Sequence, residues 1–315
     1  MKKFILKNKK IWIVGHNGMV GRAILRKLGK DHDVITISRN KLDLSSQNNV
    51  DKWMKANKPE VIFLAAGKVG GIYANNNYAA DFIYQNIIIA ANVINSAVKY
   101  KIKKLVYLSS SCIYPKNTKQ PMREEQILTG PLEPTNQWFA VAKIAGIKLC
   151  QAYRKQHGCD FISIMSTNSY GPGDNFHKDD SHVPAALLDR FHEAKAKKLK
   201  EVTVWGSGKP LREFMHVDDL ADACIFLAKN YSSHQIINVG TGKEISIRDF
   251  ANKLKGIVGY KGKLIFNTSM PDGNPRKLLC TKKINSLGWK AKISLDVGLN
   301  QYYKWYKKEY KYLRK

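Results

Sequence analysis

A glycine triplet near the start of the chain offers the clearest chemistry. Gly15, Gly18 and Gly21, in GHNGMVG, follow a short apolar run at residues 10–14 and open a helical pattern at residues 19–28. In this setting the first glycine allows a tight turn, the second lets backbone N–H groups approach a pyrophosphate, and the third lets helix and strand pack closely. The positive end of the helix also attracts an anion. The spacing therefore predicts a dinucleotide-binding turn.

The end of the second strand normally distinguishes between the two nicotinamide cofactors. An acidic residue there hydrogen-bonds the ribose 2′-OH of NAD and repels a phosphate. This chain instead reads Ile37-Ser38-Arg39-Asn40. Because an arginine suits the 2′-phosphate of NADP, Arg39 predicts NADP(H) as cofactor; the alternative is an ordinary exposed loop arginine.

Apolar segments and helical patterns alternate through the first half of the chain. The apolar segments are residues 10–14, 34–37, 61–64, 105–108 and 161–165. The helical patterns between them are residues 19–28, 47–54, 78–98 and 138–154. Continuous apolar strands that alternate with helices are typical of a parallel sheet covered on both faces. The fold class predicted is α/β, a Rossmann-type doubly wound parallel sheet.

The regular alternation of apolar segments and helical patterns becomes weaker after Gly171-Pro172-Gly173. This change predicts a Rossmann domain over residues 1–175 and a smaller C-terminal α/β substrate-binding lobe, mainly residues 176–315. An apolar strand at residues 236–239 is expected to rejoin the sheet, so a segment near residues 213–245 returns to the first domain.

Composition narrows the function classes without choosing among them. No apolar run is long enough for a membrane span, and the lysine-rich start lacks a signal core, so a cytoplasmic protein with no membrane partner is expected. The five cysteines have no metal or disulfide spacing, so no metal is predicted.

The 53 basic and 25 acidic residues give a formal charge of +28. The lysines are spread along the chain, which favours a solvated surface over nucleic-acid binding. Tyr, Trp and Lys interleave at residues 302–315, and this segment is interpreted as a final helix with an aromatic seam.

Longer motifs add a family resemblance over nearly the whole chain. The sequence closely resembles GDP-L-fucose synthases, extended short-chain dehydrogenases/reductases that epimerise C3 and C5 of GDP-4-keto-6-deoxy-D-mannose and then reduce C4. The motifs are GHNGMVG, LAAGKVGGIYANN, DFIYQN, SSCIYP, LEPTN, AKIAGIKLC, DNFH, SHV, RFHEA, VWGSG, REFMHVDD, INVGTG and PDGNPRKLL. The resemblance implies a GDP-sugar substrate and a homodimer joined through two helices per subunit, here residues 78–98 and 138–154.

The resemblance also assigns catalytic positions. Ser110 and Lys143 match the serine and lysine of the reduction, while Cys112 and His182 match the pair that exchanges protons at C3 and C5. A thiol near cationic groups and an imidazole that titrates near neutrality suit that task. Taken alone, each would be interpreted as a structural residue.

Phe139 departs from the family pattern. It stands where the family has the tyrosine that gives a proton to the C4 oxygen during reduction. Phenylalanine keeps the ring but has no hydroxyl to donate, and loss of a general acid removes roughly 10²- to 10⁴-fold of rate. Three interpretations stay open: a deliberate substitution in a competent enzyme, a natural relative that epimerises without efficient reduction, and a protein that binds nucleotide without catalysis. The intact Cys112, His182 and Lys143 argue against the last.

The binding residues implied by the resemblance fall into two sets. The cofactor is expected to contact Gly15, Asn17, Gly18, Met19, Val20, Gly21, Arg39, Asp43, Leu44, Ala65, Ala66, Lys68, Leu108, Ser109, Lys143, Ser166, Asn168 and His182. The sugar nucleotide is expected to contact Asn168, Arg190, Trp205, Arg212, Asp272 and Lys277. Cationic side chains can neutralise a diphosphate, and a tryptophan offers an apolar face.

Three functions are therefore carried forward. The first is an NADPH-dependent epimerase/reductase that makes GDP-L-fucose, with reduction impaired by Phe139. The second is a C3/C5 epimerase of a related GDP-4-keto sugar, for example a heptose, without efficient reduction. The third is a non-catalytic nucleotide- or RNA-binding protein on the same scaffold.

Overall fold

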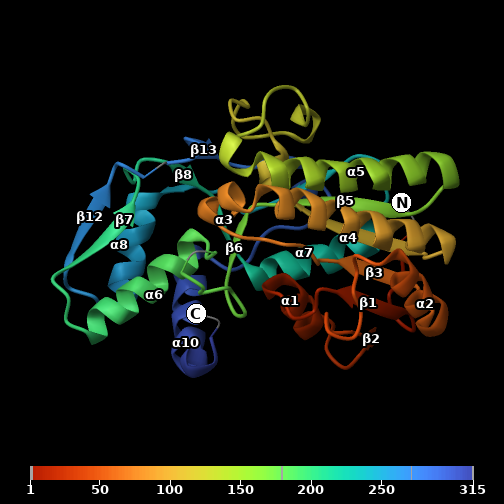
Figure 1. The fold of residues 1–315 in the computed structure, drawn as a ribbon, viewed down its shortest axis with the longest axis horizontal. Helices are drawn as coiled ribbons and strands as arrows, with labels where there is room; N and C mark the ends of the chain where they lie inside the picture. Colours follow the sequence, from red (N-terminus) through yellow and green to blue (C-terminus); the bar gives the residue numbers. More distant parts are fainter. Residues whose placement is uncertain (1–2, 179, 271, 314–315) are drawn as a thin grey trace.

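A six-stranded parallel sheet forms the centre of the larger part of the molecule. The computed structural model describes residues 3–178, 180–270 and 272–313. The strand order is β10-β5-β4-β3-β1-β2 (Figure 1). The strands are β1 Lys10–Val14, β2 Asp33–Ile35, β3 Val61–Leu64, β4 Lys104–Ser110, β5 Phe161–Ser166 and β10 Ile237–Val239. The four residues of β3 are all buried, as expected for a strand covered on both faces.

Helices cover both faces of this sheet. One layer contains α1 Met19–Leu28 and α7 Val217–Asn230, and the other contains α2 Gln47–Asn57, α4 Ala79–Lys99 and α5 Gln137–His157. Alternate residues of β1 enter the two cores: Ile11 and Ile13 pack with the first layer, and Trp12 and Val14 with the second. This is the predicted doubly wound arrangement. It brings the carboxyl ends of the strands to one edge, where ligands of such sheets bind.

A smaller lobe stands beside the carboxyl edge of the sheet. It contains α6 Val183–Ala196, β7 Glu201–Trp205, β8 Leu211–Arg212, β11 Ile245–Ser246, α8 Ile247–Val258, β12 Lys263–Asn267, β13 Arg276–Lys277 and α10 Leu295–Glu309. Two small sheets form there, β12-β7 and β11-β8-β13. Its own core is rich in aromatic residues and includes Phe176, Phe191, Phe250, Tyr302 and Tyr306.

The remaining elements are short. They are α3 Ile72–Asn77, η1 Ser111–Ile113, η2 Glu124–Gln126, η3 Pro134–Asn136, β6 Asn168–Tyr170, β9 Phe214–His216, α9 Lys282–Ser286 and η4 Tyr310–Tyr312. Strand β10 follows the first elements of the smaller lobe in the sequence and pairs with β5 of the main sheet. The chain therefore crosses between the parts more than once, while the domain boundary near residue 175 stays a prediction.

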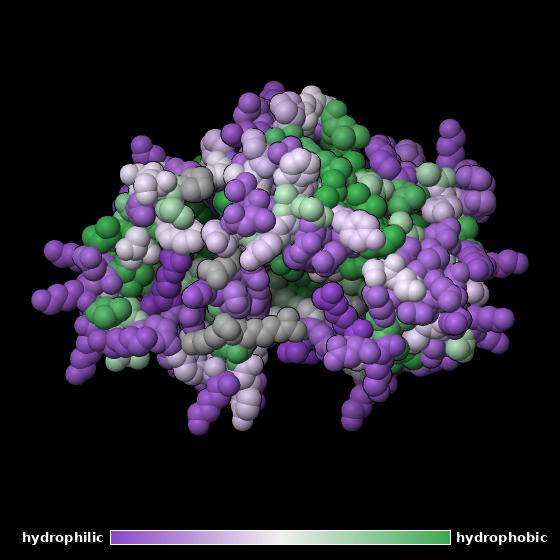
Figure 2. Space-filling model, in the orientation of Figure 1, coloured by the Kyte–Doolittle hydropathy of each residue, from purple (hydrophilic) through white to green (hydrophobic). Residues whose placement is uncertain are grey.

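Most differences from the sequence prediction lie at element ends. The final helix is present, but it begins at Leu295, because Ser294 caps its N-terminus by accepting a hydrogen bond from the Val297 N–H. Strand β2 covers only residues 33–35. Helix α3 has only six residues, IYANNN, too few to show the apolar periodicity that would predict a helix. In Figure 2, hydrophilic side chains are spread over the visible face and are not gathered at one site.

Candidate active site

The glycine turn has the geometry that a pyrophosphate site requires. Gly15 has a φ of 90°, and a Cβ added there would lie 2.8 Å from the Ala66 backbone nitrogen. A Cβ on Gly21 would lie only 2.2 Å from the Gly15 carbonyl oxygen. Side chains are thus excluded where β1 meets α1, and the start of that helix carries no acidic residue. Such a cradle fits the diphosphate of a dinucleotide.

The remaining predicted cofactor residues surround this turn. Asn17 and Gly18 are exposed, and Met19 and Val20 pack partly against the core beneath. Arg39 is exposed, and it lies close enough to Asp43 to help lower the pKa of that carboxyl, although hydrogen bonds from Ser45 are the larger cause. Leu44 is held by a hydrogen bond of 2.9 Å from the Asn92 Nδ2 to its carbonyl. Among the described residues, no ion pair within 4 Å involves Arg39, so its guanidinium could pair with a 2′-phosphate.

The ends of β4 and β5 form the floor of the site. Lys143 Nζ donates to the Leu108 carbonyl at 3.0 Å, and Ser166 Oγ donates to the Ser109 carbonyl at 3.1 Å. The Ser109 hydroxyl oxygen is buried and has no partner within the described residues. Asn168, just beyond, donates to the Glu213 carbonyl at 2.9 Å. These residues come from separate strands and a helix, and the sheet brings them together.

Lys143 occupies a buried position beneath Phe139. Its Nζ lies 5.5 Å from the centre of the Phe139 ring and 5.0 Å from the centre of the Tyr107 ring. Burial lowers the pKa of Lys143 to about 8. Phe139, one turn earlier on α5, is half-buried and meets Phe82 edge-on at 6.3 Å. The ammonium thus faces an aromatic ring that offers no hydroxyl.

Gly67 packs closely beside this lysine. A Cβ at Gly67 would lie 3.6 Å from Lys143 Nζ and only 2.5 Å from the Asn86 Oδ1, so a side chain is excluded there. That Asn86 oxygen is buried without a partner among the described residues, while the Asn86 Nδ2 donates to the Lys68 and Phe82 carbonyls. Lys68, predicted to contact the cofactor, pairs with Asp81 at 2.6 Å.

Cys112 and His182 are fixed by different elements. Cys112 is buried in η1, where its backbone N–H points to the Ser110 Oγ at 3.5 Å. His182 is the N-cap residue of α6, and the preceding turn is held by the Gly71 N–H, which donates to the Asp180 carbonyl at 3.0 Å. His182 keeps part of its surface exposed, but the surrounding protein desolvates its ring; this desolvation and, second, the charge of Lys277 lower its pKa.

Lys277 links these two residues electrostatically. Burial lowers the pKa of Lys277; Cys112 and Glu133 oppose this shift, and Arg212 adds to it. Since the same lysine also acts on His182, Cys112 and His182 both lie within electrostatic reach of one ammonium. Cys112 and His182 therefore share one charged neighbour, although 70 residues separate them in the chain.

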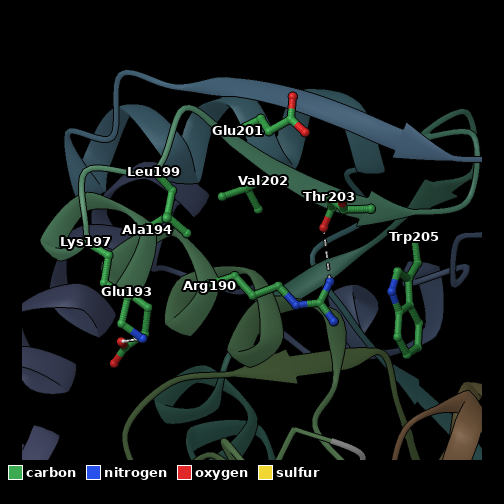
Figure 3. Close-up of a pocket in the computed structure, with 9 residues that line it drawn as sticks. All are labelled: Arg190, Glu193, Ala194, Lys197, Leu199, Glu201, Val202, Thr203 and Trp205. Carbon is green, nitrogen blue, oxygen red and sulfur yellow. Dashed lines mark hydrogen bonds and ion pairs between the residues drawn. The ribbon is translucent and has the colours of Figure 1, made fainter.

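The other predicted substrate residues lie in the smaller lobe. Arg190 reaches from α6, donates to the Thr203 carbonyl at 3.2 Å, and stacks at 5.1 Å on the half-exposed Trp205 ring (Figure 3). They line one side of a cavity of about 350 Å³. Arg212 pairs in register with Lys277, and burial lowers its pKa to about 10. A guanidinium on an aromatic face and two adjacent cations suit a nucleoside diphosphate.

Asp272, predicted to contact the substrate, is hydrogen-bonded within the protein. Its two carboxylate oxygens accept hydrogen bonds from the Ser207 N–H and the Ser207 hydroxyl, both at 2.7 Å. Its backbone carbonyl accepts from Arg212 Nη2 at 3.1 Å. The carboxylate thus holds the β7–β8 connection, and the carbonyl helps to position Arg212.

Glu133 is a site residue that sequence reasoning missed. It is buried, accepts a hydrogen bond from the Thr135 hydroxyl, and interacts with both Arg212 and Lys277. A buried carboxylate behind two cations lowers the cost of bringing them together. Its place in LEPTN was the available signal, but nothing in the sequence connected it with residues 212 and 277.

Within residues 3–178, 180–270 and 272–313, no group of three acidic, His or Cys side chains could hold a metal ion. Over the same ranges, no helix combines the length and the apolar character needed to cross a bilayer.

The doubly wound sheet, the glycine cradle and the Lys143 site define a dinucleotide-dependent enzyme of the extended short-chain dehydrogenase/reductase class. The chain belongs to the NAD dependent epimerase/dehydratase family, whose model matches residues 11–240. It is 54% identical over 304 residues to GDP-L-fucose synthase 1 of Arabidopsis thaliana, covering 96% of this chain and 94% of that protein. It is 53% identical to the GDP-L-fucose synthase of Sinorhizobium fredii, covering 96% and 97%.

A solved structure adds a related sugar nucleotide enzyme. The chain resembles a GDP-mannoheptose C4 reductase from Campylobacter jejuni with NADP bound, with a TM-score of 0.87 and 40% identity. The match covers 96% of this chain and 100% of that one.

Proposed function

We propose that this enzyme converts GDP-4-keto-6-deoxy-D-mannose to GDP-L-fucose by epimerisation at C3 and C5 followed by NADPH-dependent reduction at C4, with the reduction slowed by Phe139. The cofactor is NADP(H), in keeping with the relatives and with Arg39. The observation that carries the proposal is the 53–54% identity to GDP-L-fucose synthases over 96% of this chain, in which Cys112, His182 and Lys143 keep the family's residue types.

Epimerisation requires proton exchange on the two faces of a carbon next to a ketone. One group removes a proton from one face, and another returns a proton to the opposite face. Cys112 in η1 and His182 at the start of α6 supply two such groups from different elements of the fold.

Reduction requires a hydride and a proton at C4. NADPH, when bound, supplies the hydride. The proton normally comes from the tyrosine that Phe139 replaces, so Ser110, Lys143 and water are left to protonate the C4 oxygen. We therefore expect epimerisation at full rate and reduction at a low one.

The sugar nucleotide is assigned to the smaller lobe. Arg212 and Lys277 bind its diphosphate, and Arg190 with Trp205 binds the nucleoside end. Asn168 and Asp272 complete the predicted set, Asp272 mainly through its hold on Arg212.

We also propose a homodimer formed through α4 and α5. These helices pack side by side, and their outer surface carries the exposed apolar residues Tyr84, Trp138 and Val141. Figure 2 shows apolar side chains gathered over this region. Exposed apolar surface of this kind marks an interaction site. The cytoplasm is the proposed location, where the five free cysteines would stay reduced.

One experiment separates the two chemical steps. The protein is incubated with GDP-4-keto-6-deoxymannose and NADPH in D₂O, and deuterium incorporation is followed together with the absorbance of the reduced cofactor. We expect deuterium at C3 and C5 and slow loss of absorbance. No deuterium incorporation would overturn the proposed function.

A second candidate is epimerisation of a GDP-4-keto-heptose without efficient reduction. Phe139 and the similarity to the GDP-mannoheptose C4 reductase favour it. Faster deuterium uptake by a GDP-4-keto-heptose than by the 6-deoxyhexose, with no NADPH consumed, would select this function over the first.

A further inference from the structure

Several hydrogen bonds fix the position of the segment of residues 272–280, which contains β13. Asp272 holds Ser207, and the Leu211 N–H donates to the Pro275 carbonyl at 2.9 Å. Farther on, Leu279 N–H donates to the buried carboxylate of Glu213 at 3.0 Å. An otherwise irregular segment is thereby held at both ends, with Lys277 between.

Gln120, far away in the sequence, holds the middle of this segment. Its Nε2 donates to the Arg276 carbonyl at 3.3 Å, and its Oε1 accepts from the Leu278 N–H at 2.9 Å. Only one orientation of the amide satisfies both bonds, because one backbone partner is an acceptor and the other a donor. The two hydrogen bonds therefore fix the backbone just before and just after Lys277.

Arg276 and Lys277 are adjacent in the chain, but their side chains have different partners. Arg276 is fastened away from the site by an ion pair with Glu244, at 2.7 Å from Nη2. Lys277 pairs in register with Arg212, and its ammonium acts on Cys112 and His182. Two cations side by side repel one another, so the backbone must keep Lys277 in place. The hydrogen bonds of Gln120 act at that position.

We propose that Gln120 is a positioning residue for substrate binding, which holds the peptide groups on both sides of Lys277 and so keeps the lysine ammonium in the site. This inference rests on the proposed function, in which Lys277 binds the diphosphate. Gln120 does not itself touch the substrate; it acts through Lys277 and requires that residue for its effect.

The test is a double-mutant cycle on GDP binding. Gln120→Met keeps the size of the side chain and removes both of these hydrogen bonds, together with the one that Nε2 donates to the Thr118 carbonyl at 3.2 Å. Loss of two such bonds is expected to weaken GDP binding roughly 5- to 30-fold. In a Lys277→Met background the same change is expected to have almost no further effect, because the lysine through which it acts is absent. NADPH affinity, governed by the glycine cradle, should not change.

Two further variants serve as controls. Gln151→Met removes a comparable amide hydrogen bond, to the His234 carbonyl at 3.0 Å, away from the site, and should leave GDP affinity unchanged. Gln120→Glu keeps the acceptor for the Leu278 N–H and loses the donor to Arg276, so a partial loss is expected. It also decides the question if Gln120→Met fails to fold.

The outcomes separate this inference from the proposed function. If wild-type protein does not bind GDP, the proposed function itself fails. If it binds GDP and both Gln120 variants bind equally well, the positioning role is wrong. An equal loss with and without Lys277 also overturns it, because Gln120 would then act by another route.

Discussion

The substitution Phe139→Tyr tests the account of the reduction directly. It adds one oxygen to a ring that is half-buried and lies 5.5 Å, centre to Nζ, from Lys143. Restoring a positioned general acid is worth roughly 10²- to 10⁴-fold in rate, which corresponds to about 3 to 5 kcal/mol of transition-state stabilisation. We therefore expect C4 reduction to rise by that factor, while deuterium exchange at C3 and C5 stays the same.

The pH dependence adds a second signature. Burial lowers the pKa of Lys143 to about 8, so the ammonium that assists the new tyrosine is present below that pH and is lost above it. The reduction rate of the Phe139→Tyr variant should accordingly fall as pH rises through about 8. The assay follows the absorbance of NADPH with GDP-4-keto-6-deoxymannose, at pH values from 6 to 9.

The double variant Phe139→Tyr/Lys143→Met is the matched control. It carries the hydroxyl without the ammonium and should regain little of the reduction. The reasoning is refuted if Phe139→Tyr binds NADPH normally, still exchanges deuterium, and reduces no faster than the original chain.

Three other predictions concern the epimerisation, the cofactor turn and stability. Cys112→Ser should lower deuterium uptake at C3 and C5 by about 10²-fold or more with unchanged NADPH affinity, measured by mass spectrometry; undiminished uptake would remove Cys112 from the mechanism. Gly21→Ala places a methyl 2.2 Å from the Gly15 carbonyl oxygen and should weaken NADPH binding by at least about tenfold in a fluorescence titration, whereas Gly256→Ala, which meets open space, should not. Burial raises the pKa of Asp174 to about 7, so its contribution to stability is full below the ordinary carboxyl pKa and is lost as pH rises toward 7. Asp174→Asn should gain on the original chain by up to about 1.4 kcal/mol per pH unit between pH 5 and 7 in urea unfolding and level off above; a constant difference across pH would contradict this.

The sequence predicted the Rossmann core closely, for a local reason. Strands such as residues 61–64 and the first helix at residues 19–28 carry their apolar pattern in consecutive residues, and burial on both faces of a parallel sheet imposes that pattern. The glycine spacing was equally informative, because the close approach of Gly21 to the Gly15 carbonyl oxygen lies within seven residues of the sequence. The exchange of tyrosine for Phe139 was likewise visible in the sequence alone.

Tertiary structure decided which residues share a site. The sequence resemblance named Cys112, His182 and Lys277, but only the fold brings η1, the start of α6 and strand β13 near enough for Lys277 to interact electrostatically with both of the others. Three interactions could not be predicted from neighbouring residues: the electrostatic interaction of the buried Glu133 with Arg212 and Lys277, the hydrogen bonds of Asp272 to Ser207 and Arg212, and those of Gln120 on both sides of Lys277. Hydrogen bonds and charges act through space over a few ångströms, whereas residues 120 and 277 are more than 150 positions apart, so only the folded chain could bring them together.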